Sequence, residues 1–555
     1  MKKTSILLAT TLSLYASPIP NISDFLNEVK PPKIEKKKEV LPPLQQESEQ
    51  YKKSFEDGKK VFIKSFSMSG NTQINTEKIQ TILKPYEEKE LSFKEIQEIV
   101  TRITKTYRDE GYFIARAYIP TQDLQAQDGV LKIAIIEGKY GEFKLENSSL
   151  VKDSILQDTL DVTKNKEVIA IKDLQRALLL INDTPGVKVS STKIAAGRDI
   201  GSSDFIIGTQ TTQPYNVYVI GDNYGSDYTG KHRAVVGIDI NSPLKIGDKV
   251  SLSALSSENM GLLNGIVGYS FPIHSSGLRG EIRYAKTTYE LGDKYAILDA
   301  VGNADSFVAL FTYPIIRSND ENLNTYLRTS YNKMNDEIQS ISSAVTKNTL
   351  VSKVGLDYLK YQLINDNLSQ TKIDTSLSLG RLQFNNLVTK SDDEAGANTN
   401  GNFSKINIEL ENNTMLTDTI NWKNRLQLQY ALGDKNLDGS EDMSLGGANG
   451  VKLYPDGEES AENGYIYNTE VNYSLPFYKG INSKIGLFYD IGKVKMSKNI
   501  TDEKSRTLQD VGVSYYASYK DFFLNTHLAY KVGSARVTSA DDYNSRFMFQ
   551  TGFIF

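Results

Sequence analysis

The side chains that most often carry chemistry are sparse in this 555-residue chain. It has no cysteine, so no disulfide, thiolate nucleophile or cysteine-bound metal can form. Its three histidines, His232, His274 and His527, stand far apart and lack metal-ligand spacing. A nucleophile elbow, a Walker loop and a dinucleotide-binding fingerprint are all missing from the sequence. We therefore predict no enzyme activity, no catalytic residue, no metal and no cofactor, although a hydrolase built from carboxylates that meet only in space stays open.

One acidic segment resembles part of a cation-binding loop. Asp434, Asn436 and Asp438 alternate and precede Gly439, as in the first half of a calcium-binding EF-hand. The twelfth position of such a loop supplies a bidentate glutamate, but here it is Leu445, and no helical pattern flanks the segment. We predict a solvated hairpin or loop at this place.

The composition is polar but rich in aromatic rings. Charged residues make up 24% and mean hydropathy is −0.39, yet the chain has 32 Tyr and 21 Phe. These values suit alternating strands whose aromatic side chains gather at membrane interfaces. The formal net charge of −4 gives no reason to expect nucleic acid as a partner.

The N-terminus carries an export signal. Lys2 and Lys3 precede an apolar run from Ile6 to Leu14, and Ala16 follows, so residues 1–16 are predicted to be a cleaved signal peptide. No other apolar stretch reaches the ~18 residues of a transmembrane helix. If the protein crosses a membrane, it must do so as a closed barrel. The alternative is a soluble periplasmic protein.

A short helix and a linker follow the signal. Residues 17–30 are predicted to hold one amphipathic helix, with Ile22, Phe25, Leu26 and Val29 on a common face. Residues 31–58 contain four prolines and dense charge of both signs, which predicts a flexible linker that buries no core. The helix would therefore be free to dock elsewhere on the protein.

Two units of the same βααββ order occupy residues 59–138 and 139–211. In the first unit, a capping box at Ser92 opens the second helix and Gly111 ends it. Gly186 holds the equivalent position in the second unit. We predict two small α+β domains in tandem.

From residue 212 to 555 the pattern has a period of two. Apolar and polar side chains alternate in segments such as 422–430 and 484–492, as expected of lipid-facing and lumen-facing rows. The chain ends in an alternating aromatic row that includes Phe553 and Phe555, typical of the closing strand of an outer-membrane barrel. At roughly 10 residues a strand plus turns and long outer loops, the region predicts about 16 antiparallel strands.

Four segments in order carry a resemblance to a known family: Asn182 to Val187 with Ala196-Gly197, Gly221 to Gly225 with Gly230, Gly247-Asp248 after Pro243, and Leu445 to Gly447 with Gly464-Tyr465. With these segments, the chain resembles the two-partner secretion transporters of the outer membrane, the TpsB family, whose paired modules are called POTRA domains. The resemblance covers essentially the whole chain after the signal. It implies a membrane β-barrel, preceded by two α+β POTRA domains and a short plug helix.

The same family has a motif on a loop that folds into the lumen, Val-Arg-Gly followed by Tyr or Phe. Val451, Lys452, Leu453 and Tyr454 resemble it with two departures. Lysine keeps the charge of arginine but lacks its bidentate fork, and leucine lacks the backbone freedom of glycine.

The family's partner motif on the barrel wall is Phe-x-Asp-x-Gly. It is intact here as Phe488, Asp490 and Gly492, which the alternation places on the lumenal face. We expect Lys452 to contact Asp490, because an unpaired carboxylate on a narrow lumen wall tends to recruit a partner. The alternative is that Lys452 points into water.

The resemblance implies a function in protein export. The POTRA domains, in the periplasm, would capture an unfolded exoprotein of the adhesin, haemolysin or toxin type, and the lumen would conduct it to the cell surface without ATP. The barrel would contact outer-membrane lipid, and the barrel assembly machinery would insert it. The alternatives are a barrel-assembly factor of the same superfamily, which typically has more POTRA modules and no strapped helix, and a porin or ligand-gated receptor, which has no use for residues 60–211.

Overall fold

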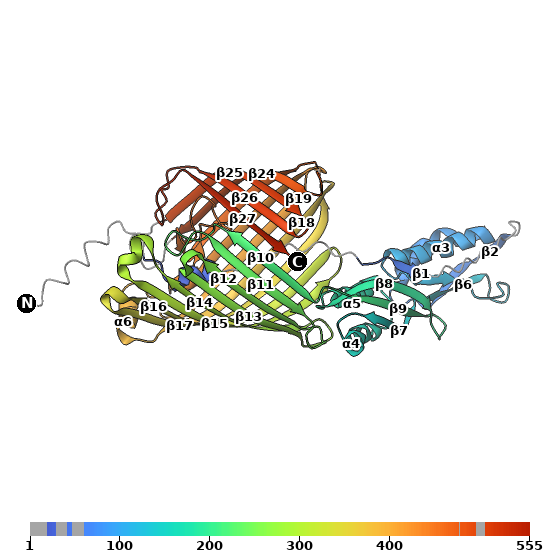
Figure 1. Cartoon of the computed structure of the whole chain (residues 1–555). Helices are drawn as coiled ribbons and strands as arrows, with labels where there is room; N and C mark the ends of the chain where they lie inside the picture. The colour runs from blue at the N-terminus through green and yellow to red at the C-terminus, as the bar shows by residue number, and fades with distance from the viewer. Residues whose placement is uncertain (1–18, 29–40, 47–59, 477, 496–504) are drawn as a thin grey trace, which may run out of the picture.

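The computed structural model describes residues 19–28, 41–46, 60–476, 478–495 and 505–555. The predicted signal peptide and most of the predicted linker lie outside these residues. Two small modules stand end to end at one mouth of a large barrel (Figure 1). Among the helices of the described ranges, none is long and apolar enough to cross a membrane.

The first module packs two helices on strands that surround one core. Its elements are β2 (Lys60–Ile63), β3 (Ser65–Ser69), α2 (Thr76–Leu83), η1 (Lys84–Tyr86), β4 (Lys89–Ser92), α3 (Phe93–Asp109), β5 (Arg116–Tyr118) and β6 (Val130–Ile136). The Ser92 hydroxyl accepts from the Glu95 backbone N–H, and the Glu95 carboxylate accepts from the Ser92 N–H, which closes the predicted capping box. The first predicted strand is in fact two, because Lys64 leaves the ladder and its N–H donates to the Gly129 carbonyl. β2 then pairs with β4, and β3 pairs with β6.

The second module repeats this plan with β7 (Lys139–Ser148), α4 (Asp153–Lys164), α5 (Ile171–Asn182), β8 (Val187–Ala196) and β9 (Ser202–Thr211). Its sheet has the order β1-β8-β9-β7. Leu160, Leu174, Leu178 and Phe205 are among the fully buried side chains between helices and sheet. The tandem repeat of the sequence therefore corresponds to two separate cores.

The sheet of the second module includes a strand from the region predicted to be a linker. β1 (Leu44–Gln46) adds to β8 in parallel, and Leu41 and Leu44 pack against the module's core. The prediction of a flexible segment that buries nothing is therefore wrong at residues 41–46. The physical reason is that β8 would otherwise leave unpaired backbone groups at a sheet edge, which an extended segment can satisfy whatever its composition.

The barrel is closed by sixteen antiparallel strands, with β10 paired to β27, as predicted. The strands are β10 (Tyr215–Asp222), β11 (Arg233–Asn241), β12 (Lys249–Ser257), β13 (Leu262–Pro272), β14 (Arg279–Glu290), β15 (Ala300–Arg317), β16 (Glu321–Ile338), β17 (Ser343–Ile364), β18 (Asn367–Phe384), β19 (Gly401–Met415), β20 (Ile420–Leu432), β23 (Asn463–Ser474), β24 (Asn482–Lys495), β25 (Ser505–Tyr519), β26 (Phe522–Lys531) and β27 (Ser545–Ile554). Short turns join them at the module end. The turn between β17 and β18 has Asn365 and Asp366 at positive φ, as a two-residue hairpin requires.

Side chains of the barrel strands alternate between the lipid face and the lumen. On β24, Leu487 is 66% exposed on the outside, whereas Phe488 is 2% exposed on the inside. The predicted rows therefore correspond to the two faces. Phe553 and Phe555 stand on the outer face at the module end, and the Phe555 N–H donates to the Val217 carbonyl across the β10–β27 seam at 2.8 Å.

The second module is fastened to the nearest barrel turns by charged groups. Arg317, at the end of β15, holds both carboxylate oxygens of Asp183 at 2.7 Å. Arg176 of α5 donates to the carbonyls of Pro314 and Ser276, at 2.6 and 3.2 Å. Arg317 thus reaches from the barrel to the module, and Arg176 reaches from the module to the barrel. These contacts give the module a defined position under the barrel mouth.

Candidate functional site in the barrel lumen

The connection between β20 and β23 does not stay outside the barrel but folds into its lumen. We call residues 433–462 the inward segment. It contains η5 (Gly439–Glu441) and the small hairpin of β21 (Met443–Ser444) with β22 (Ser460–Ala461). Its tip needs glycine, because a Cβ on Gly446 would lie 1.9 Å from the Pro455 carbonyl oxygen and Gly447 has a φ of +89°.

The tip buries its four motif residues against the wall formed by β24 to β26. Val451, Leu453 and Tyr454 are fully buried, and Lys452 is 9% exposed. They share a cluster with Phe488, and Leu445 fills the space that a side chain at Gly492 would occupy. The segment is thus held by apolar packing as well as by polar contacts.

Lys452 and Asp490 lie together at the centre of this site. The Lys452 Nζ donates to Asp490 Oδ2 at 2.8 Å and sits 4.2 Å from the centre of the Phe488 ring. The other oxygen of Asp490 accepts from the Asn468 side-chain amide at 2.8 Å. Asp490 has no solvent exposure, so these neighbours take the place of water around its charge.

The two positions that depart from the family motif have separate explanations. The Leu453 backbone is not left-handed, so leucine costs no strain there, and its N–H donates to a carboxylate oxygen of Asp510. Asp510 lies opposite Asp490 in the β24–β25 ladder. An arginine fork could serve both carboxylates, whereas the single ammonium of Lys452 reaches Asp490 and leaves Asp510 to the backbone.

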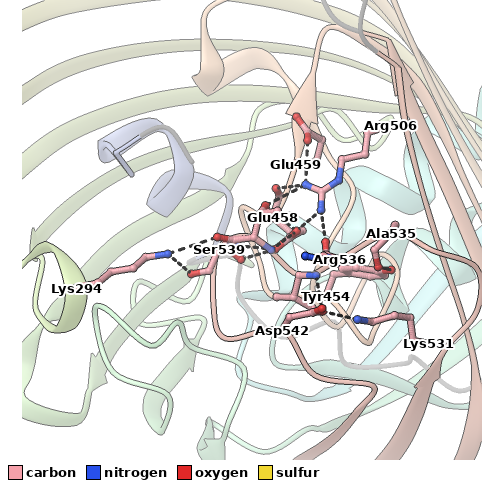
Figure 2. A network of polar contacts seen from close by, with 12 residues as sticks. Lys294, Tyr454, Glu458, Glu459, Arg506, Lys531, Ala535, Arg536, Ser539 and Asp542 are labelled. Carbon is pink, nitrogen blue, oxygen red and sulfur yellow. Dashed lines mark hydrogen bonds and ion pairs between the residues drawn. The ribbon is translucent and has the colours of Figure 1, made fainter. Parts of the chain in front are cut away.

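A second set of contacts ties the inward segment to the last outer connection, residues 532–544 (Figure 2). One Glu458 oxygen accepts from the Thr538 N–H and hydroxyl, at 2.8 and 2.9 Å, and the other accepts from the Ser539 N–H and hydroxyl, at 3.0 and 2.6 Å. Arg506 of β25 bridges Glu458 and Glu459. Lys294, from η3 (Asp293–Leu298), reaches the Ser539 carbonyl at 3.2 Å. The buried Glu458 carboxylate thus joins two loops and a strand.

The N-terminal helix α1 (Ile22–Glu28) lies inside the barrel, in the half far from the modules (Figure 1, dark blue). Its Phe25 ring packs 4.6 Å from the Tyr289 ring and 6.2 Å from Tyr228, measured between centroids. The Ile22 N–H donates to Asp336 on β16 at 2.7 Å. Ile22 and Phe25 are at most 1% exposed and Leu26 is half-buried, so these three residues of the predicted apolar face are covered by the barrel, whereas Val29 lies outside the described residues.

The acidic segment of the inward segment supports this helix. Asn436 and Asp438 are 3% and 7% exposed, and Asp438 pairs with Lys347 of β17 at 2.7 Å. The Lys347 ammonium also donates to the Ser23 hydroxyl of α1 at 3.1 Å. The segment is a loop, as predicted, and Asp434 is exposed, but the prediction of a solvated loop is wrong for Asn436 and Asp438, whose side chains exchange water for protein partners where the helix docks. Within the described residues, no group of three or more His, Asp or Glu could hold a metal ion.

Sequence reasoning missed several residues of the site. No sequence motif indicates that Asp510, Glu458 and Asn468 belong to the site, and their partners are distant in the sequence. The alternation of β25 could have placed Asp510 on the lumenal face. For Glu458, no sequence signal points to Thr538 and Ser539, which lie 80 and 81 positions away.

Comparisons with known proteins fit this architecture. Residues 201–535 match the family model described as "Haemolysin secretion/activation protein ShlB/FhaC/HecB", and residues 61–138 match "POTRA domain, ShlB-type". The heme/hemopexin transporter protein HuxB of Haemophilus influenzae strain 86-028NP is 28% identical over 448 residues, which are 80% of this chain and 78% of HuxB.

Two solved structures share the fold. CdiB from Escherichia coli superposes with a TM-score of 0.75 at 18% identity, covering 92% of each chain. CdiB from Acinetobacter baumannii gives 0.65 at 17% identity, covering 96% of each. At these identities the likeness is one of fold.

Proposed function

Since the chain belongs to the haemolysin secretion/activation protein family of bacterial outer-membrane transporters, we propose that it carries one particular exoprotein from the periplasm to the cell surface. The observation that carries this proposal is the combination of a closed barrel, a helix docked in its lumen and two modules at its periplasmic mouth. A pore that must stay shut until its substrate arrives needs both a plug and a receptor.

The two modules, residues 59–138 and 139–211, capture the exoprotein. β5 and β3 are the outer strands of the first module's three-stranded sheet, and Phe62 of β2 is 55% exposed. An extended polypeptide can add to such an edge through backbone hydrogen bonds and place alternate side chains on the apolar surface. An unfolded exoprotein offers many such segments, whereas a folded one does not.

The exoprotein passes through the lumen of the barrel, which residues 212–555 form. The inward segment and α1 both obstruct this lumen at rest, so both must move. The pair of Lys452 and Asp490 holds the inward segment against the wall at rest, and the contacts of α1 hold the plug helix. No nucleotide chemistry is available in the periplasm, so export draws on folding of the exoprotein at the cell surface, which removes it from the unfolded pool.

The remaining assignments concern biogenesis and cargo. Phe553 and Phe555 form the signal that the barrel assembly machinery reads, and the outer face binds outer-membrane lipid. Relatives of this chain are named as transporters of heme/hemopexin and of hemolysin. By analogy, the cargo is an exoprotein of the adhesin, haemolysin or toxin class, and the chain works as a pore rather than an enzyme.

Gene deletion tests the proposal. Removing the gene for this chain should leave the exoprotein encoded beside it inside the cell, where periplasmic proteases degrade it, and plasmid-borne chain should restore its appearance at the surface. The abundance of other outer-membrane barrels is measured in parallel. Unchanged surface exoprotein together with a general loss of barrels would favour an assembly factor instead.

A further inference from the structure

Two lumenal cations face each other on the barrel wall. Arg328 of β16 and Lys353 of β17 are direct partners in the antiparallel ladder. Their outward neighbours Leu327 and Val354 are 42% and 56% exposed to lipid, so the two cations point inward. Like charges at directly opposed positions of a sheet repel each other.

Nearby acids that the structure describes attract the two cations but bind neither of them directly. Among the described residues, neither Arg328 nor Lys353 hydrogen-bonds to or ion-pairs with a carboxylate. The acids in their surroundings are already engaged: Glu281 binds Arg283, Glu441 pairs with Lys405 at 2.8 Å, and Asp374 accepts from the Tyr326 hydroxyl.

The cations belong to a longer basic stretch of wall. Lys405 of β19 lies in the same row as Lys353, with Ser378 between them, and Arg283 of β14 is a charged neighbour of Arg328. Lys405 and Arg283 form ion pairs with Glu441 and Glu281, whereas Arg328 and Lys353 form none within the part of the chain that the structure describes. The Arg328 side chain remains exposed within the lumen and Lys353 is half-buried, so both are accessible from the pore.

We infer that Arg328 and Lys353 form a binding site for carboxylate groups of the polypeptide in transit. A carboxylate placed between them would receive two charge-assisted hydrogen-bonding partners and remove the repulsion. The direct ladder neighbours on the two sides of the pair are the uncharged Leu310 and Ser378, so binding rests on the two charges and is weak enough to release. Successive acidic side chains of the exoprotein would therefore each bind transiently and dissociate. The inference rests on the proposed export function.

Planar bilayers provide a test that does not require secretion. The starting protein lacks residues 21–28, which removes one of the two segments that obstruct the lumen, and a short poly-L-glutamate is added on the side of the modules. We expect it to block the current, and we expect Arg328→Gln with Lys353→Gln to raise the half-blocking concentration by about tenfold at low salt. The block should weaken as KCl is raised, because salt screens the charges.

Three controls make the result specific. Lys188→Gln removes a positive charge from the exposed face of the second module and should leave the block unchanged. Arg328→Lys retains the charge and should retain most of the block by poly-L-glutamate. Any block by poly-L-lysine should be no weaker in the double variant than in the starting protein. Barrel closure of each variant is verified by heat-modifiable migration. An unaltered poly-L-glutamate block in the double variant would overturn the inference, as would a change in chloride selectivity alone, which would indicate small ions only.

Discussion

Lys452 shows how one residue type changes a lumenal contact. The Lys452 ammonium is a point charge that donates a hydrogen bond to Asp490 at 2.8 Å. It also makes a cation–π contact with the face of the Phe488 ring. Truncating one member of a buried ion pair typically costs about 3–5 kcal/mol, since the remaining charge stays buried without a partner. Removing either partner should therefore destabilise the resting position of the inward segment far more than breaking an exposed pair would.

We predict that Lys452 and Asp490 are energetically coupled. Lys452→Ala and Asp490→Ala should each impair secretion per assembled barrel, and the double variant should be no worse than the poorer single variant. Lys452→Arg should preserve or improve function, because its fork can reach both Asp490 and Asp510. Secreted exoprotein is normalised to heat-modifiable barrel. Strictly additive losses would show that the two residues act separately.

Glu458 provides a second residue-level prediction. Glu458→Gln keeps the size of the side chain but loses the charge that Arg506 and the four hydrogen-bond donors of Thr538 and Ser539 require. Hydrogen bonds to a charged group each contribute about 1.5–3 kcal/mol, so the connection 532–544 should become loose. Limited proteolysis of intact cells should then cleave it severalfold faster. Glu394→Gln, in the exposed helix α6 (Leu387–Ala395), is the matched control; equal cleavage rates in both variants would contradict the prediction.

At the level of elements, a helix as short as α1 has little stability of its own. Its seven residues are held by the barrel through Phe25, the Ile22 N–H and the Ser23 hydroxyl. All three contacts involve strand residues, namely Tyr289, Asp336 and Lys347, and the Ser23 hydroxyl also donates to Asp438 of the inward segment at 3.4 Å. The plug and the inward segment are therefore parts of one supported unit.

We predict that removing α1 opens the pore. Deletion of residues 21–28 should raise single-channel conductance several-fold in planar bilayers, because the aromatic contacts that fill the far half of the lumen disappear. Phe25→Ala should give frequent openings at an intermediate level, since burial of a phenylalanine contributes about 1.5–3 kcal/mol. Phe62→Ala, on the first module, is the control and should behave as wild type. Conductance that does not change on deletion would mean that α1 does not obstruct the pore.

At the scale of the whole molecule, the barrel and the modules have separate cores and separate hydrogen-bond ladders. The barrel satisfies its backbone through the closed β10–β27 seam and needs nothing from the modules. Contacts between the two parts lie at the barrel turns: besides those of Arg317 and Arg176, the Ser242 hydroxyl donates to the Pro185 carbonyl and the Lys152 N–H donates to the Lys245 carbonyl. Loss of the modules should therefore abolish recognition of the exoprotein but leave the barrel able to close.

We predict that a variant lacking residues 60–211 forms a heat-modifiable barrel in the outer membrane but secretes no exoprotein. Outer-membrane fractions show the barrel on unheated gels, and immunoblots of the medium report the exoprotein. Arg317→Ala serves as a milder companion: it should keep the capture modules and lower secretion only partially. Wild-type secretion by the deletion variant would remove the proposed capture role.

What the sequence determined by itself is local and periodic. The alternation of side chains predicted a barrel, the length of the region predicted about sixteen strands, and helical spacing predicted two repeated modules. These predictions were correct because the patterns depend on neighbours in the chain. Family motifs added Lys452 and Asp490 as candidates.

Tertiary structure decided which distant groups meet. Ile22 and Asp336 are 314 positions apart, and Asp438 is buried by a helix and a lysine that no spacing rule connects to it. The segment 44–46 reads as linker in isolation and becomes a strand only because β8 presents an open edge. A polar side chain can be solvated or buried with a partner at similar free energy, and only the fold that supplies the partner determines which.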